Sequence, residues 1–242
     1  MLGTLFGRPE DWPPRDLIGY SDEFDAALAL EAYRCGVFPM PLNHREMGWW
    51  SPVDRGLLPI RGLHVTRSLR KTAARYTTTT NADFRNVLHR CADPARDGAW
   101  IDSRISSAYR RLARLGWVRS VEVWDADGRL AGGLYGVQMG GLFAGESMFH
   151  DPERGRDASK VALIRLALEL DDSGVELLDV QWLTEHLGSL GAYQVPREEY
   201  LRRLSRALDK PTVEWPKRPP VSGADLVMLW RQLSDHRPRT AP

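Results

Sequence analysis

Two different spacings of apolar residues divide the chain into helical and extended segments. A recurrence every three to four positions predicts helices with one apolar face. This spacing is found in segments 22–35, 68–75, 84–91, 103–115, 158–170, 184–190, 197–208 and 224–233.

Strands are predicted where apolar residues alternate with polar ones or form short runs. These segments are 56–60, 121–124, 130–137, 142–149 and 177–181. Short turns join the three strands between 120 and 149, so we expect them to be antiparallel neighbours. Helices and strands together predict a mixed α/β (α+β) fold.

Two stretches are rich in proline. Residues 8–20 are expected to be irregular, and 210–220 to form a linker. The four threonines at 77–80 form a low-complexity run. The sequence Trp49-Trp50-Ser51-Pro52 ends a small N-terminal module. We therefore expect three parts, which are a small domain over 1–53, a larger domain over 54–208, and a linker with a final helix over 209–242.

The composition is that of a globular protein. With 242 residues, 43% hydrophobic and 27% charged, the chain is neither collagen-like nor a coiled coil nor wholly disordered. Only two cysteines are present, which argues against a disulfide framework and favours a reducing compartment. A charge and a proline follow within nine residues of Met1, and no apolar run reaches the ~18 residues of a membrane span. We expect a cytoplasmic protein without a signal peptide.

The formal charge of +1 hides an uneven distribution. Residues 1–60 carry 5 basic and 9 acidic side chains, 61–119 carry 13 and 4, and 120–242 carry 15 and 19. The middle segment therefore has a charge of +9, and Arg supplies 12 of its 13 cations. Because guanidinium groups bind phosphate in a bidentate manner, this segment is a candidate nucleic-acid interface.

Two groups of cations lie on predicted helices of this middle segment. The first, on one helical face, consists of Arg67, Arg70, Lys71 and Arg75. The second consists of Arg104, Arg110, Arg111 and Arg114. Trp100 and Tyr109 lie near the second group and offer rings on which unpaired bases could stack. Ordinary solvated helix faces give the same pattern, so both interpretations stay open.

Two carboxylates in apolar strands are candidate catalytic groups. Asp179 and Gln181 lie two positions apart near the end of a strand, so alternation is expected to project them together. A buried carboxylate is costly unless it is hydrogen-bonded, which points to function at Asp179, with a structural hydrogen bond as the alternative. Glu146 lies among small and apolar residues of another strand. Together they predict an apolar pocket with two acids, suited to an apolar side chain and a reacting amine.

Several common catalytic motifs are absent. The sequence has no Walker A loop, no GxGxxG after a strand, no GxSxG and no HExxH, and its six histidines are scattered. Common NTPases and hydrolases are therefore not indicated, and we predict neither a metal site nor a cofactor.

Several short strings occur in the same order as in the leucyl/phenylalanyl-tRNA–protein transferases of bacteria. The chain resembles this family from about Asp22 to Leu208. The strings are Trp49 to Pro52, Leu63 to Ser68, Ser120 to Trp124, Gly132 to Gly136, Gly145 to Phe149, Ala158 to Lys160, Leu178 to Gln181, Thr184 to Leu187 and Ser189 to Ala192. The resemblance implies a small N-terminal domain followed by an acetyltransferase-like (GNAT-like) domain with a mostly antiparallel mixed sheet. It also implies transfer of Leu or Phe, with Met as a further donor to test, from tRNA to the α-amine of an N-terminal Arg or Lys. The product marks a protein for degradation.

The resemblance also implies site residues. Asp179 and Gln181 match a pair that polarises or deprotonates the attacking amine, and Glu146 matches an acid beside the terminal adenosine. The side-chain pocket is expected to consist of Leu134, Phe143, Met148, Leu163, Leu166, Leu170 and Leu178. The tRNA contacts are expected to be Tyr33, Met40, Arg67, Arg70, Lys71, Arg75, Trp100 and Tyr109. Relatives carry Trp at the position of Met40, and aromatic residues at those of Leu166 and Leu170.

The implied partners are aminoacyl-tRNA and an acceptor protein or peptide, and we expect a monomer. An aminoacyl ester is already activated, so this reaction needs no ATP, metal or redox cofactor. One alternative is a transferase that uses the same donor to acylate a small-molecule or peptide amine. Another is a catalytically silent RNA-binding protein. An acetyl-CoA enzyme is a weaker alternative, since no Arg/Gln-x-x-Gly-x-Gly/Ala loop precedes the helix at Ala158.

Overall fold

The computed structural model of the chain describes residues 5–96 and 98–235. Residues 1–4 lie outside the described residues. They belong to the expected N-terminal domain and to the N-terminal segment in which no signal peptide is expected. The last seven residues of the expected C-terminal part also lie outside the described residues. Within the described ranges, none of the helices has the length and apolar composition of a membrane span.

The N-terminal part forms a three-stranded antiparallel sheet with the order β1-β3-β2. Its strands are β1 (Leu17–Ser21), β2 (Phe38–Pro41) and β3 (Met47–Trp50), and a short 3-10 helix, η1 (Pro9–Asp11), precedes them. The helix α1 (Ala26–Arg34) begins after Asp25, whose carboxylate accepts the Leu28 N–H at 2.8 Å. Residues 8–20 were expected to be irregular, but pairing with β3 makes 17–21 a strand, and the prolines of this stretch lie before it.

The larger sheet has eight strands in the order β10-β4-β9-β8-β7-β6-β5-β11. They are β4 (Asp54–Leu57), β5 (Thr77–Thr80), β6 (Val118–Trp124), β7 (Leu130–Met139), β8 (Leu142–His150), β9 (Leu177–Gln181), β10 (Tyr193–Pro196) and β11 (Val221–Ser222). The β8–β9 pair is parallel and the other pairs are antiparallel. The prediction of a mixed α/β fold with a mostly antiparallel sheet is confirmed, as is the β6-β7-β8 meander.

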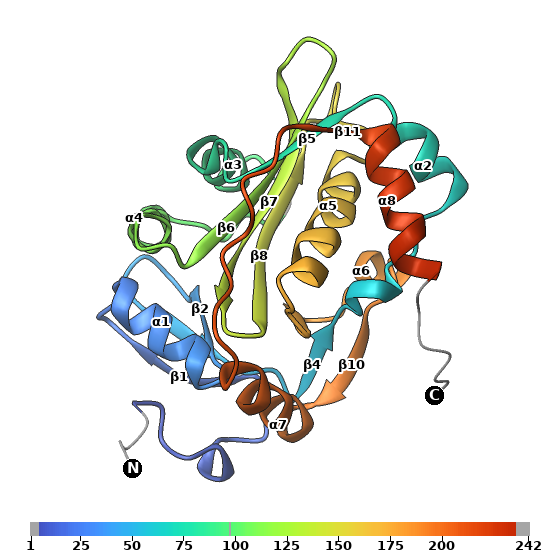
Figure 1. Cartoon of the computed structure of the whole chain (residues 1–242). Helices are drawn as coiled ribbons and strands as arrows, with labels where there is room; N and C mark the ends of the chain where they lie inside the picture. Colours follow the sequence, from blue (N-terminus) through green and yellow to red (C-terminus); the bar gives the residue numbers. More distant parts are fainter. Residues whose placement is uncertain (1–4, 97, 236–242) are drawn as a thin grey trace.

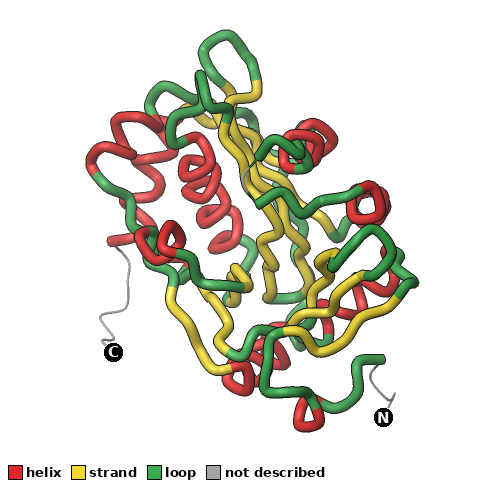
Figure 2. Tube along the Cα trace, turned by 180° about the vertical axis from the view of Figure 1, so that it is seen from behind, coloured by secondary structure: helices red, strands yellow, loops and turns green. Residues whose placement is uncertain are grey.

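Helices cover both faces of the larger sheet (Figures 1 and 2). One face carries α2 (Arg67–Ala73), α5 (Ala158–Asp172) and α8 (Gly223–Asp235), and the other carries α3 (Phe84–Cys91) and α4 (Ser103–Arg114). The remaining helices are the 3-10 helix η2 (Ile60–Gly62), α6 (Glu185–Ser189) and α7 (Arg197–Leu208). Each face of the sheet thus has its own apolar core, one around α5 and one around α3 and α4.

In the larger sheet, three strands were not predicted from the sequence, and none of the three strands of the small sheet was. The threonine run is β5, because β-branched side chains favour extended backbone and this strand pairs with both β6 and β11. The strands β10 and β11 have only four and two residues and form at the ends of the sheet. Such short strands depend on a partner distant in the sequence, which no local pattern reveals.

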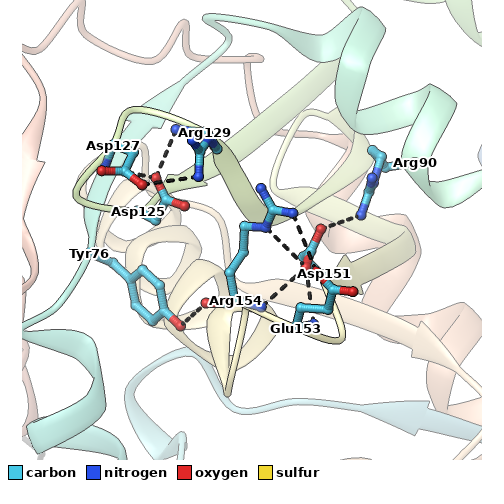
Figure 3. A network of polar contacts seen from close by, with 8 residues as sticks. All are labelled: Tyr76, Arg90, Asp125, Asp127, Arg129, Asp151, Glu153 and Arg154. Atoms are coloured by element: carbon cyan, nitrogen blue, oxygen red, sulfur yellow. Dashed lines mark hydrogen bonds and ion pairs between the residues drawn. The ribbon is translucent and has the colours of Figure 1, made fainter.

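The loop between β8 and α5 is fixed by Asp151 (Figure 3). One carboxylate oxygen accepts the backbone N–H groups of Glu153 and Arg154, and the other accepts Arg90 Nη2 at 2.9 Å. Burial alone would raise the pKa of Asp151, but these hydrogen bonds lower it. The Tyr76 hydroxyl donates to the Arg154 carbonyl at 3.0 Å. The beginning of α5 is therefore held in place, and α5 forms one side of the site described next.

Candidate active site

An apolar cavity of about 430 Å³ lies between α5 and the β7-β8-β9 part of the larger sheet, with β2 and α6 completing its lining. This volume is within the range of small-molecule pockets, about 300–1,000 Å³. Six of the seven residues predicted for the side-chain pocket line it, namely Leu134, Phe143, Met148, Leu163, Leu166 and Leu178. Leu170 does not, since it is fully buried one turn further along α5 in the apolar core.

Part of the lining escaped the sequence analysis. It consists of Phe38, Pro39, Gly98, Tyr135, Gly145, Ser147, Val180, Trp182, Thr184 and Leu187. The rings of Phe38 and Trp182 meet edge-to-face at 4.9 Å, which connects the small N-terminal sheet to the cavity. Trp182 is fixed by its indole N–H, which donates to Asp16 at 2.8 Å. For Phe38, the available signal was an aromatic residue between Gly36 and two prolines, where a helix cannot continue.

Gln181 faces the cavity from an unusual backbone conformation. Its φ angle is +60°, a left-handed value that costs a residue other than glycine about 1–3 kcal/mol. Its backbone N–H donates to Asp179 Oδ1 at 2.9 Å, and its side-chain Nε2 donates to the Gly145 carbonyl at 2.6 Å. The second bond orients the amide, so that its carbonyl oxygen remains as an acceptor for another group.

The prediction that Asp179 and Gln181 project together from one face is wrong. Leu178 and Val180 line the cavity, and by alternation Asp179 lies on the opposite face of β9. The left-handed backbone at Gln181 interrupts the alternation and brings its side chain to the cavity side. The Asp179 carboxylate is therefore linked to the cavity side through its hydrogen bond with the Gln181 N–H.

Arg55 and Tyr200 hold the carboxylate of Asp179, and both were missed by the sequence analysis. Arg55 Nε and Nη2 donate to the two carboxylate oxygens at 2.8 and 2.6 Å, and the Tyr200 hydroxyl donates to Oδ2 at 2.8 Å. Arg55 and Asp179 are almost fully buried, and the guanidinium stacks on the Tyr200 ring at 4.2 Å. Burial works to lower the pKa of Arg55, but the facing carboxylate raises it above its ordinary value. The signal available in the sequence was an arginine within the predicted apolar strand region near 56–60.

Glu146 is a second carboxyl group in the cavity lining, and it is held by two buried tyrosines. Its Oε2 accepts the Tyr109 hydroxyl at 2.9 Å, and Tyr109 is in turn hydrogen-bonded to the Tyr33 hydroxyl. Its Oε1 is buried without a hydrogen-bond partner among the described residues. Burial raises the pKa of Glu146 to about 7, although the tyrosine hydrogen bonds oppose this effect. The carboxyl group therefore changes its charge near neutral pH.

The expected tRNA contacts fall into three environments. Met40 and Trp100 line the cavity and are partly exposed. Tyr33 and Tyr109 are almost fully buried, so neither ring has a free face for a base, and burial followed by the Glu146 charge raises the pKa of both hydroxyl groups. The remaining contacts lie away from the cavity lining, with Arg67, Arg70 and Lys71 on the surface of α2 and Arg75 in the turn that follows it; these four are called the cations of α2 here.

The cationic residues of α4 are in part engaged within the protein. Arg104 donates to the backbone carbonyls of Asn43 and Arg45 at 2.7 Å and pairs with Asp102. It therefore joins α4 to the loop between β2 and β3. The other three, Arg110, Arg111 and Arg114, are exposed on the same helix.

Two family models match the chain. The model of the leucyl/phenylalanyl-tRNA protein transferase matches residues 57–205, which include Glu146, Asp179, Gln181 and all of the cavity lining except the β2 residues. The model of the N-terminal domain of the same family matches residues 22–53. The chain belongs to the leucyl/phenylalanyl-tRNA protein transferase family. It is accordingly an aminoacyltransferase of this family, as the resemblance implied.

Similar proteins of this family cover most of the chain. A leucyl/phenylalanyl-tRNA–protein transferase of Afipia carboxidovorans is 45% identical over 219 residues, which are 87% of this chain and 95% of that protein. One of Anaeromyxobacter dehalogenans is 46% identical over 205 residues, 83% of this chain and 86% of that protein. Among solved structures, L-PGS from Bacillus licheniformis gives a TM-score of 0.38 at 9% identity, covering 90% of this chain and 73% of the other. A GCN5-related N-acetyltransferase from Sphaerobacter thermophilus gives 0.36 at 14% identity, covering 76% and 59%.

Proposed function

We propose that this protein transfers Leu or Phe from aminoacyl-tRNA to the α-amine of an N-terminal Arg or Lys of an acceptor protein. The observation that carries the proposal is an apolar cavity whose lining includes a hydrogen-bonding amide, Gln181, and a carboxyl group, Glu146. Relatives with about 45% identity carry the name leucyl/phenylalanyl-tRNA–protein transferase. We further propose that the protein acts in the cytoplasm as a monomer, and that the new N-terminus marks the acceptor for degradation.

In this reaction, the amine nitrogen of the acceptor attacks the ester carbonyl carbon of the donor. A C–N bond forms, the C–O bond to the terminal ribose breaks, and the proton lost by the amine is balanced by the proton gained by the released ribose oxygen. The ester supplies the driving force, so the enzyme has to bring the two substrates together and direct the proton. The cavity binds the apolar side chain of the donor and thereby places the ester.

Gln181 orients the attacking amine. An amide is a weak base, but its carbonyl oxygen accepts a hydrogen bond from the amine and directs the nitrogen lone pair toward the ester. Asp179 and Arg55 act as positioning residues, because the carboxylate holds the Gln181 backbone and the guanidinium holds the carboxylate. This chain of contacts runs from β4 through β9 to the cavity.

Glu146 contacts the aminoacyl-tRNA at its terminal adenosine. Its buried, unpaired Oε1 requires a hydrogen-bond donor, and the terminal adenosine and its aminoacyl group carry several. Met40 and Trp100 contribute partly exposed apolar surface to the lining of the same cavity. The cations of α2 then contact the phosphates of the acceptor stem.

An acceptor screen tests this proposal. The protein is incubated with tRNA carrying labelled Leu, Phe, Met or Ala, together with peptides beginning with Arg, Lys or Ala or with free amino-acid amines. We expect one residue to be added, from Leu and Phe donors, to peptides that begin with Arg or Lys. Transfer to small amines alone would favour the alternative acceptor class, and binding of tRNA without any peptide-bond product would favour a silent RNA-binding protein.

A further inference from the structure

The segment between α7 and β11, residues 209–220, crosses the larger sheet from one end to the other and is called the strap here (Figure 1, red trace between α7 and β11). Of residues 211–220 only Trp215 is buried, with 6% of its surface exposed, and the other nine are exposed. An exposed segment that inserts one large aromatic side chain into the core makes a specific contact there.

That contact is with Phe143. The two rings are stacked, with their centroids 6.0 Å apart and an angle of 20° between their planes. Phe143 lines the cavity, whereas Trp215 does not. Trp215 therefore lies behind the cavity wall and supports one of its side chains.

Phe143 is confined from a second side by β7. A Cβ atom placed on Gly136 would lie 2.4 Å from Cε1 of the Phe143 ring, closer than any real contact. The glycine therefore lets the backbone of β7 meet the edge of the ring directly. With Gly136 at its edge and Trp215 at its face, the ring keeps one position in the wall.

The strap is attached on both sides of Trp215. Before it, Thr212 Oγ1 accepts the Gly140 N–H at 2.7 Å, and the Val213 carbonyl accepts Gln138 Nε2 at 3.0 Å. After it, Arg218 pairs with Asp172 at the end of α5. These contacts restrict how far the indole can move away from Phe143.

We infer that Trp215 is a specificity-determining positioning residue, which sets the depth of the cavity by holding Phe143. This inference rests on the proposed function, in which the cavity binds the donor side chain. One methylene group in an apolar pocket changes discrimination by about 10–200-fold, so a small shift of Phe143 alters the preference between Leu and Phe. The indole N–H is buried without a partner in the described part of the chain, which means that ring packing, and not a hydrogen bond, carries the effect.

The experiment measures binding of two unreactive donor analogues, adenosines that carry leucine or phenylalanine in a 3′ amide linkage. In Trp215→Ala, Phe143 can retreat into the vacated space, and we expect the ratio of the two Kd values to shift about ten-fold toward the larger phenylalanyl analogue. Trp215→Leu should shift it less. Trp215→Phe, which keeps an aromatic ring, and Glu214→Ala, which changes an exposed neighbour, should leave the ratio within about two-fold of the wild type.

The ratio compares two ligands on one protein, so a general loss of stability does not move it. If Trp215→Ala does not fold, as judged by circular dichroism, Trp215→Leu decides, because it retains much of the buried volume. An unchanged ratio in folded Trp215→Ala or Trp215→Leu overturns the inference. Failure of the wild type to bind either analogue counts against the proposed function instead.

Discussion

The backbone N–H of Gln181 donates to Asp179 Oδ1 at 2.9 Å, and this bond fixes a left-handed residue at the wall of the cavity. The carboxylate is thereby the link between the buried Arg55 and the amide that faces the cavity. Asp179 is fully buried and accepts hydrogen bonds on both oxygens, and the role proposed for it is to hold Gln181 in position.

Arg55→Met is expected to lower the free energy of unfolding by about 3–5 kcal/mol, because it leaves the Asp179 carboxylate buried without its cation. Arg202→Ala removes an exposed pair with Glu198 and Glu199, and should lower the free energy of unfolding far less, because water screens an exposed ion pair. Urea denaturation of both variants measures the difference. Equal losses in the two variants would mean that the buried pair is no more important than a surface one.

The stability of the protein should depend on pH through Glu146. Its pKa is raised to about 7 in the folded protein, against an ordinary value of 4.5. The folded state therefore binds this proton more tightly, and the associated stability is fully present below pH 4.5 and is lost as the pH rises through 7. Glu146→Gln cannot ionise, so the wild type should lose stability relative to this variant between pH 4.5 and 7. Urea denaturation at several pH values gives the free energy of unfolding of both proteins. A constant difference between them from pH 4.5 to 7 would contradict the assignment.

Leu166 and Leu170 provide a matched pair on α5. Both are buried, but only Leu166 lines the cavity. Truncation of either to alanine should cost about 2–5 kcal/mol of stability. Only Leu166→Ala should change the ratio of kcat/KM for Leu and Phe donors, in favour of Phe because the cavity grows. A similar change in Leu170→Ala would show that the ratio responds to core stability and not to the lining.

The cations of α2 should determine the salt dependence of tRNA binding. Replacement of Arg67, Arg70 and Arg75 by Ala should weaken binding and reduce the slope of log K against log salt by about one for each lost phosphate contact. The control is the pair Arg202→Ala and Arg203→Ala on α7, where both arginines pair with Glu199. Filter binding at several salt concentrations provides the slopes. An unaltered slope in the triple variant would place the tRNA elsewhere.

The sequence predicted most helices because their apolar faces repeat locally. The segment 84–91 matches α3 to the residue, and α4, α5 and α7 differ from prediction by a few residues at most. It failed at strands whose stability comes from a distant partner. β10 pairs with β4 across more than a hundred residues of chain, and the four residues of β10 have no strong pattern of their own.

The candidate site was predicted in part. Local strings pointed to Glu146, Asp179 and Gln181, and six of the predicted apolar residues line one cavity. The direction of the Gln181 side chain could not be predicted, because it depends on the left-handed backbone at this residue, which breaks the alternation along β9. Arg55 and Tyr200 could not be found either, since they reach Asp179 from positions 124 and 21 residues away.

Gln181→Gly tests the central claim most directly. Glycine readily adopts the left-handed backbone, so the variant removes the side-chain amide without disturbing the chain. Asn81→Gly is the control, since Asn81 also has a positive φ angle of 54° but lies outside the cavity lining. The measurement is the single-turnover rate of leucyl transfer from saturating Leu-tRNA to a peptide that begins with Arg. The account predicts a fall of about 100-fold in Gln181→Gly, with binding of the leucyl analogue retained. A rate equal to that of the wild type would contradict it.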